Sequence, residues 1–359
     1  MADVETDAIE SRIIFVRGDD SSSVRDLIDA AHFRGEVEPI WRDLLRLVAA
    51  EKKANESDLE IDDAAIDTAA EQFRYEHDLI TAEETERWLD ERGLTLGDFS
   101  AWFVRRYWGE TGDEAAPEVV DYLFAPVALR ALLTIELILG GELDRMAARS
   151  SWRVAARQAE GGDRVDPSLL AEEEARFLER SGLQKGPIGD WLSRLGRDDA
   201  WLREQIAMEA VYLRDSSALL SREARSREIS ALRLPLTLFE VETIEFDSLD
   251  AAREALLCVR QDGMAMEEVA GEGRYPYRHA EILLEDVPED LQQKFLSVTP
   301  GAVLEPITRG EGFHLCRILG KAEPNVDDPT VKTRAEDRIL DRHFGELTAK
   351  HIQWKNLLP

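Results

Sequence analysis

The most informative segment for the fold runs from Phe295 to Leu319. It reads FLSVTPGAVLEPI over residues 295–307 and GFHLCRIL over residues 312–319. Pro300 and Gly301 mark a turn, because proline fixes one backbone angle and glycine accepts a left-handed one. The apolar runs on either side of residues 309–312 have the composition of two short strands joined by a tight connection. The stretch therefore predicts the end of a helix, a turn and a β-hairpin.

Upstream of this stretch, the composition changes at about Leu232, where helical spacing gives way to β-like alternation. The pattern over 232–322 predicts the order β-α-α-β-α-β-β. The expected elements are a strand ending at Phe246, helices at Leu249–Arg260 and Met264–Val269, a loop at Gly271–His279, a strand at Ala280–Leu284, a helix from Pro288 to Ser297, and the hairpin.

Residues 1–230 carry helical periodicity almost throughout, apart from a β-branched run at 11–16 that predicts one short strand. This strand could pair with the sheet of residues 232–322 or with a second chain. A weak internal repeat relates 71–106 to 174–210, each with a Phe, then a Trp, then a Gly suited to a helix C-cap. Chance similarity between two amphipathic hairpins is the alternative.

These patterns predict an α+β protein. Its expected parts are a large all-α lobe at 1–230, a mixed domain at 232–322, and a C-terminal helix with a tail at 327–359. The last helix has an apolar stripe that includes Ala335, Ile339 and Phe344. The stripe is expected to pack on the chain's own helical lobe, and a homodimer contact is the alternative.

Charge limits the partners. The chain has 359 residues and a formal net charge of −30, which argues against nucleic acid and anionic membranes because both bind through clustered Lys and Arg.

The first residues, MADVETD, lack the basic and apolar regions of a secretory signal, so a cytoplasmic location is expected. Cys258 and Cys316 are expected to be buried free thiols. No metal-ligand spacing or cofactor motif is found, so neither a metal nor a cofactor is predicted.

The stretch 295–319 resembles the parvulin family of peptidyl-prolyl isomerases. Residues 295–307 look like the family's F-x-L-x-P-G-x-V-S-x-P-V with one residue added after Phe295, and residues 312–318 look like its G-[YF]-H-[IL]-x-[KR]-[IVL]. The helical segments 71–106 and 118–210 resemble, more loosely, the N-terminal region of SurA-type chaperones. The resemblance implies a peptide-binding cleft in residues 232–322.

The departures from the family pattern lie in the catalytic set. Thr243 stands where the family carries a His in its first strand, the Gly-Gly-x-Leu-Gly turn is missing, and only the second His is kept, as His314. The resemblance therefore implies a degenerate cleft that binds extended peptide and catalyses poorly or not at all. The residues expected to bind peptide are Thr243, Tyr275, Tyr277, Leu284, Phe295 and His314.

The resulting hypothesis is a cytosolic, chaperone-like protein that binds peptide or unfolded polypeptide. The expected ligand is the precursor (leader) peptide of a ribosomally made, modified peptide, with the peptide-modifying enzymes as further partners. Two alternatives stay open: an active cytosolic prolyl isomerase, and a dimeric scaffold for maturation enzymes. The peptide could cross the cleft above His314 or add a strand to an open sheet edge.

Overall fold

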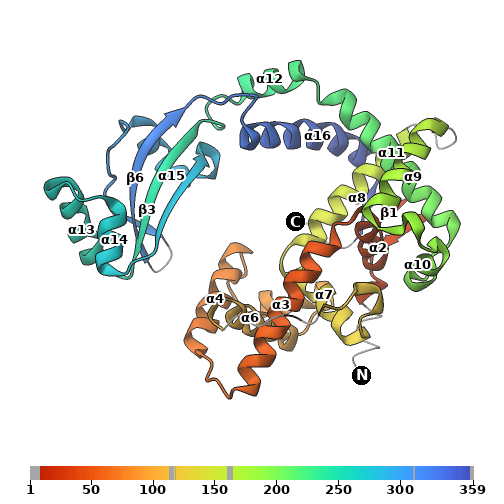
Figure 1. Cartoon of the computed structure of the whole chain (residues 1–359), viewed down its shortest axis with the longest axis horizontal. Helices are drawn as coiled ribbons and strands as arrows, with labels where there is room; N and C mark the ends of the chain where they lie inside the picture. Colours follow the sequence, from red (N-terminus) through yellow and green to blue (C-terminus); the bar gives the residue numbers. More distant parts are fainter. Residues whose placement is uncertain (1–8, 113–116, 118, 160–164, 310–311, 356–359) are drawn as a thin grey trace. The chain divides into compact units, whose positions relative to one another are not determined.

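The computed structural model describes residues 9–112, 117, 119–159, 165–309 and 312–355. The chain forms two compact units (Figure 1). Unit 1 comprises Met1–Ser216 with His343–Pro359, and unit 2 comprises Ser217–Arg342. The sequence pattern placed boundaries at 230–232 and 322–327, where the type of secondary structure changes. The units instead follow packing, and two long helices, α11 and α16, each pass from one unit into the other.

Unit 1 is mostly helical. Its helices are, in chain order, α2 (Val24–Arg34), α3 (Val37–Glu56), α4 (Asp63–Glu76), α5 (Ala82–Arg92), α6 (Leu96–Thr111), α7 (Val127–Leu139), α8 (Glu142–Ala159), α9 (Pro167–Arg180), α10 (Ile188–Leu195) and α11 (Asp199–Leu219). The helix α16 (Pro329–His351) returns to this unit at its C-terminal end. There Phe344 is fully buried and stacks on Trp152, so this part of the predicted apolar stripe packs on the chain's own lobe.

A small three-stranded sheet completes unit 1. The predicted N-terminal strand is β1 (Ile13–Arg17), and it pairs antiparallel with β2 (Asp20–Ser23) and with β7 (Gln353–Trp354) near the C-terminus. Its partners thus come from its own unit. The sequence did not predict β2, whose residues Asp-Ser-Ser-Ser have low strand propensity. The turn at Gly18, with φ of 56°, folds this segment back onto β1, and the pairing overrides the propensity.

The two predicted repeat segments each fold into three consecutive helices, α4–α6 and α9–α11. In the first, Phe73 meets Trp88 edge to face with ring centroids 5.6 Å apart. In the second, Phe177 meets Trp191 in the same way at 5.2 Å. The segments therefore share a specific aromatic contact as well as an amphipathic pattern.

Helix ends in the two segments match as well. Gly93 closes α5 and Gly196 closes α10, both in the left-handed conformation with φ of 74° and 70°. Thr95 caps the helix that follows Gly93, and the Asp198 carboxylate accepts the Trp201 N–H at the start of the helix that follows Gly196. Only glycine takes up this conformation without strain, which explains its place in the motif.

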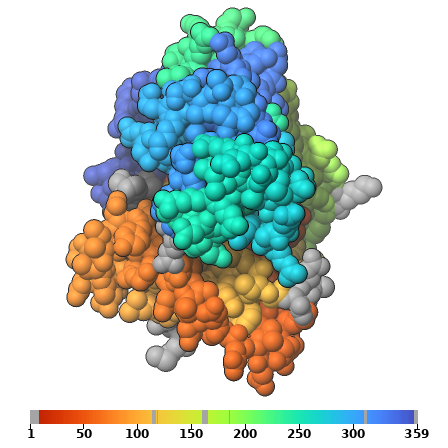
Figure 2. All heavy atoms as spheres, turned by 90° about the vertical axis from the view of Figure 1, so that its left-hand side faces the viewer, coloured from red at the N-terminus to blue at the C-terminus, as the bar shows by residue number. Residues whose placement is uncertain are grey.

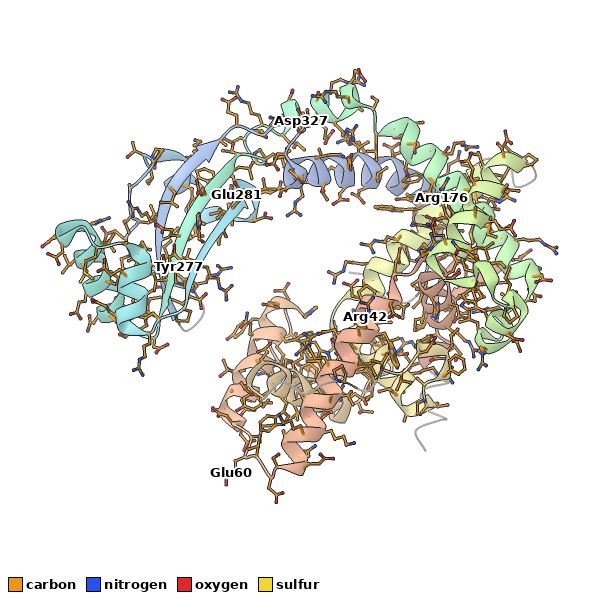
Figure 3. All side chains as sticks on the ribbon, viewed as in Figure 1. Arg42, Glu60, Arg176, Tyr277, Glu281 and Asp327 are labelled. Carbon is orange, nitrogen blue, oxygen red and sulfur yellow. The ribbon has the colours of Figure 1, made fainter. Side chains whose placement is uncertain are left out.

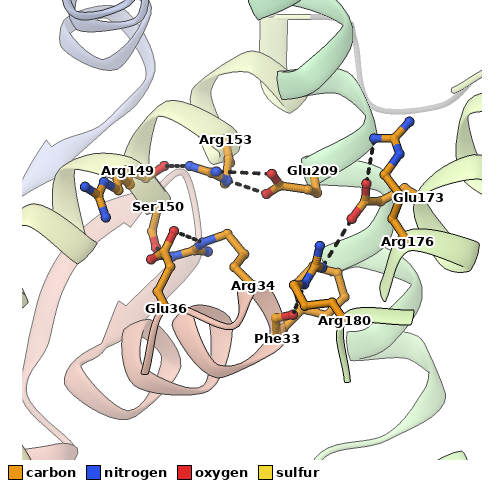
Figure 4. Close-up of polar contacts among 10 residues, drawn as sticks. All are labelled: Phe33, Arg34, Glu36, Arg149, Ser150, Arg153, Glu173, Arg176, Arg180 and Glu209. Atoms are coloured by element: carbon orange, nitrogen blue, oxygen red, sulfur yellow. Dashed lines mark hydrogen bonds and ion pairs between the residues drawn. The ribbon is translucent and has the colours of Figure 1, made fainter. Parts of the chain in front are cut away.

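Charged side chains are buried where α2, α8, α9 and α11 meet (Figure 4). Arg153 on α8 makes a two-pronged ion pair with Glu209 on α11, and both side chains are about nine-tenths buried. Glu173 on α9 is fully buried and accepts hydrogen bonds from Arg176 at 3.0 Å and Arg180 at 3.4 Å. Pairing of this kind is what makes buried charge tolerable.

Unit 2 is built around a four-stranded antiparallel sheet of order β4-β3-β6-β5. Its elements are α12 (Arg222–Ala231), β3 (Leu238–Phe246), α13 (Leu249–Leu257), a short π-helix (Cys258–Asp262), α14 (Met266–Gly273), β4 (Tyr277–Leu283), α15 (Glu289–Ser297), β5 (Ile307–Arg309) and β6 (Gly312–Ala322). Gly310 and Glu311 of the predicted hairpin lie outside the described residues.

Both faces of this sheet are partly covered. Helices α13 and α14 pack on one face around Ile244, Phe246 and Leu315, whereas α15 packs on the other around Phe239 and Ile318. In Figure 2 the α13–α14 side, in teal, lies toward the viewer. The face covered by α15 is called the α15 face below. Because strand side chains alternate between faces, the neighbours in sequence Thr243 and Ile244 belong to opposite faces.

The predicted α+β class with a large helical lobe is confirmed. The loop expected at Gly271–His279 is wrong at both ends, because α14 continues to Gly273 and β4 begins at Tyr277. The turn at Arg274, with φ of 56°, ends α14 and directs the chain into pairing with β3, which single-sequence alternation does not reveal. Among the described residues, no helix has the length and apolarity that a membrane span requires.

Candidate functional site

The site begins with the register of two central strands. Thr243 on β3 lies opposite Cys316 on β6, and Glu245 lies opposite His314. Directly opposed residues of an antiparallel pair point to the same face, so Thr243 and His314 are diagonal neighbours on the α15 face. The structure thus brings together the two positions that the sequence assigned to the degenerate cleft.

Edge strands extend this surface on both sides. Arg278 on β4 lies opposite Thr243, and Ile307 on β5 lies opposite His314. Thr243, His314 and Ile307 are half-buried, whereas Arg278 is exposed. Beyond the cover of α15, the face therefore presents a hydroxyl, an imidazole, a guanidinium and one apolar side chain to solvent.

Burial lowers the pKa of His314 below its usual value. Glu245 opposes this shift, while Arg309 and Arg278 reinforce it. Arg278 also lies 3.6 Å from Glu245, which offsets the charge of that carboxylate. The His314 ring is consequently neutral at pH 7 and can both donate and accept a hydrogen bond.

Cys316 lies on the same face but is only 3% exposed. Burial raises the pKa of its thiol to about 12, so the reactive thiolate is absent at neutral pH. Within the described residues, no group of three or more His, Cys, Asp or Glu side chains is placed to hold a metal ion. The polar groups that this face exposes are thus the Thr243 hydroxyl, the His314 ring and the Arg278 guanidinium.

Phe295 and Leu284 sit beneath this surface. Phe295 is 4% exposed and packs edge to face against Phe239 at 5.5 Å, and Leu284 is 2% exposed in the same core cluster. Phe295 projects from α15 itself and Leu284 follows β4, and both lie in the core between α15 and the sheet, so a ligand reaches either side chain only if α15 shifts.

Tyr275 and Tyr277 lie on the opposite face. Tyr277 pairs with Ile244, and its hydroxyl donates to Glu242 at 2.7 Å. Burial and this hydrogen bond raise the pKa of Tyr277 to about 12. Tyr275 packs on Phe246 at 4.6 Å. The structure therefore does not bring these tyrosines to Thr243 and His314, and their role in peptide binding stays a prediction.

Sequence reasoning missed Glu245, and it grouped Arg278 with the aromatic and basic loop at 271–279 rather than with this face of the sheet. Glu245 follows Thr243 by two residues, so strand alternation alone would have put both on one face. Arg278 carries no such signal, because its position depends on where β4 begins.

No protein-family model and no curated protein sequence matches this chain. Among solved structures, the chain is similar to the peptidylprolyl isomerase PrsA of Bacillus anthracis, with 14% identity over 57% of this chain and 95% of that one, at a TM-score of 0.31. It is also similar to PrsA of Bacillus cereus, with 9% identity over 65% and 89% of the two chains and a TM-score of 0.34. A SurA-like chaperone of Campylobacter jejuni overlaps at 9% identity over 61% and 89%, with a TM-score of 0.19. Scores and identities at this level assign no activity.

Proposed function

We propose that this protein binds an extended polypeptide segment on the α15 face of unit 2 and at the adjoining edge strand β4. The ligand proposed is a precursor peptide, through its leader segment, during maturation of a ribosomally made, modified peptide. Peptide-modifying enzymes would meet the protein through that shared ligand, in the cytoplasm.

The observation that carries this proposal is the position of β4. It is a seven-residue strand at the end of the sheet order, and among the residues that the structure describes it pairs with β3 alone. An antiparallel edge strand leaves alternate N–H and C=O groups free for an added strand. Figure 3 labels Tyr277 and Glu281 along this strand. A peptide added beside β4 would extend the surface formed by Arg278, Thr243 and His314.

Charge gives the second support. A protein with net charge −30 attracts basic segments, repels acidic ones at long range and does not repel neutral ones. At short range, the neutral ring of His314 and the hydroxyl of Thr243 suit main-chain amides, which carry no net charge. Both features favour recognition of backbone over recognition of a phosphate or a carboxylate.

The test is calorimetry with the precursor peptide encoded beside the gene and a scrambled control. We expect micromolar binding, about −8 kcal/mol. His314→Ala should weaken it by about 1–2 kcal/mol through loss of a hydrogen bond. The matched control is His343→Ala, because His343 lies on α16, outside the sheet and its edge strand. Equal affinity for the scrambled peptide, or equal loss in both variants, would reject the proposal.

Amide hydrogen exchange separates the two binding modes. Strand addition predicts slower exchange for alternate amides within Tyr277–Leu283 when the peptide is present, whereas binding over His314 alone leaves them unchanged. A prolyl-isomerase assay on proline tetrapeptides belongs to the same experiment. A rate that is lost in His314→Ala would make the protein an enzyme and overturn a purely binding role.

A further inference from the structure

The edge strand β4 presents free backbone groups from alternate residues. Just ahead of the strand, the Glu245 N–H donates to the Pro276 carbonyl at 3.1 Å. Hydrogen-bonded and non-hydrogen-bonded pairs alternate along an antiparallel ladder, so the even-numbered residues of β4 bond to β3 through their main chain. The N–H and C=O groups of His279 and Glu281 therefore point away from β3, and they are the groups that an added strand would pair with.

An added strand would place its side chains against two different surfaces. Directly opposed residues point to the same face, so the residue opposite Glu281 would lie on the face of α13 and α14, and its neighbours in sequence on the α15 face. On the α15 face, β4 offers Ala280 and Ile282, and Ile282 packs on the core under α15. Arg278, further along the same side, lies beside Glu245. The α15 side of the edge is thus apolar at two consecutive positions.

The other side of the edge carries two acids that face each other. In one row of residues paired across the sheet, Glu281 on β4 lies opposite Glu240 on β3, which lies opposite Gly320 on β6. Like charges directly opposed on neighbouring strands are destabilising. Glu240 contacts the His279 ring at 3.0 Å, a full charge pair only when that ring is protonated. The exposed carboxylate of Glu281 has no hydrogen bond or ion pair within the part of the chain that the structure describes.

Arginines of the neighbouring segments are engaged by other carboxylates. Arg317 on β6 belongs to the next row of the same face and lies 3.7 Å from Glu242. Arg334 on α16 donates to Asp286, which follows β4, at 2.8 Å. The row that ends at Glu281 is therefore left acidic at the open edge of the sheet, where a cation on an added strand would lie beside it.

We propose that the edge of β4 selects extended segments in which apolar and basic side chains alternate, and that Glu281 is the residue that specifies the basic position. The inference rests on the strand addition proposed above and names its specificity. Apolar side chains of the segment contact Ala280 and Ile282. A Lys or Arg side chain lies opposite Glu281 and offsets the repulsion between this carboxylate and Glu240. The order of the residues, and not the net charge alone, then decides which segments bind.

The test uses three blocked peptides on the full-length protein: acetyl-Val-Lys-Val-Lys-Val-Lys-Val-amide, its isomer acetyl-Val-Val-Lys-Lys-Lys-Val-Val-amide, and acetyl-Val-Gln-Val-Gln-Val-Gln-Val-amide. The readout is the saturable shift of the backbone amide resonances of His279 and Glu281. We expect the alternating Lys peptide to bind about twofold to fivefold more tightly than the Gln peptide, as exposed ion pairs allow. It should also bind more tightly than its isomer, which has the same composition and charge. Added salt should reduce the preference for Lys over Gln, because exposed charges are screened.

Glu281→Gln should remove most of the preference for Lys over Gln while retaining binding of the alternating peptides. Glu223→Gln is the matched control, because Glu223 is exposed on α12, outside the sheet, and its loss changes the net charge equally. This control should keep the preference. If the native protein binds the two alternating peptides equally, or the two Lys peptides equally, the inference is overturned and strand addition stands. If no peptide shifts either amide, strand addition at β4 and this inference are rejected together.

Discussion

Phe15 on β1 and Trp354 on β7 meet edge to face, with ring centroids 5.4 Å apart and planes inclined at 78°. The Lys355 N–H donates to the Ile14 carbonyl at 2.8 Å beside this contact. The two ends of the described chain are thus joined in unit 1, and the C-terminal end of α16 is fixed to the N-terminal hairpin.

Trp354→Ala should therefore destabilise unit 1. An aromatic contact of this kind adds about 0.5–1.5 kcal/mol to the loss of buried area. We expect a lower midpoint in urea unfolding and faster amide exchange in β1, with exchange in β3 unaffected. Trp354→Phe keeps a ring in place and should recover most of the loss. Unchanged exchange in β1 after Trp354→Ala would contradict the contact.

Replacing Gly189, within the short helix α10, and Gly196, at its end, by alanine should change stability in opposite directions. Gly196 closes α10 with φ of 70°, so Gly196→Ala should cost about 1 kcal/mol through backbone strain. Gly189 lies within α10, and no atom lies within 4 Å of the place where a Cβ would sit. Gly189→Ala should stabilise the helix by up to about 1 kcal/mol. Thermal unfolding of the two variants checks the signs, and a shared direction would refute the assigned cap.

Breaking the buried pair of Arg153 and Glu209 should be costly. Glu209→Ala leaves the Arg153 guanidinium buried beside Arg34, whose pKa is already lowered by burial and by Arg153. We expect a loss of about 3–5 kcal/mol in unfolding free energy.

The exposed pair of Arg222 with Asp327 provides the control for that loss. Both of its side chains are about two-thirds exposed, so Asp327→Ala should change stability by less than about 1 kcal/mol. Similar losses in the two variants would show that burial is not the cause.

The pKa of His314 should respond to its neighbours in opposite directions. Glu245→Gln removes the group that raises it and should lower the pKa further, whereas Arg278→Gln should raise it. NMR titration that follows an imidazole ring proton of His314 measures both pKa shifts. Movement in the same direction in both variants would show that the strand register at this site is wrong.

The same shift sets a pH dependence for stability. The unfolded chain, with a His pKa of about 6.5, takes up the proton before the folded chain does. The contribution of His314 is therefore complete above about pH 6.5 and is lost as the pH falls through the lower folded value. In His314→Ala this part of the pH dependence should disappear from denaturation midpoints measured between pH 7 and pH 5.

The sequence predicted some residues of the site correctly and grouped others with them that lie on the opposite face. Thr243 and His314 were assigned by motif resemblance, and the β3–β6 register places them as neighbours on one face. Tyr275 and Tyr277 were grouped with them because they belong to an aromatic and basic loop expected at 271–279. The face on which a strand residue lies depends on its position in the strand, and β4 begins earlier than expected. A shift of one residue in strand register places a side chain on the other face of the sheet.

Local structure could be predicted from the sequence alone: the amphipathic helices, the glycine caps at Gly93 and Gly196, the turn at Pro300, and the order of strands and helices in 232–322. These depend on periodicity and on backbone preferences, which act over a few residues. Which distant segments meet follows only from folding: β1 pairs with β7, Arg153 with Glu209, and Phe344 packs on Trp152. Such contacts depend on the packing of whole elements, and a single sequence carries no term for residues that become neighbours only after folding.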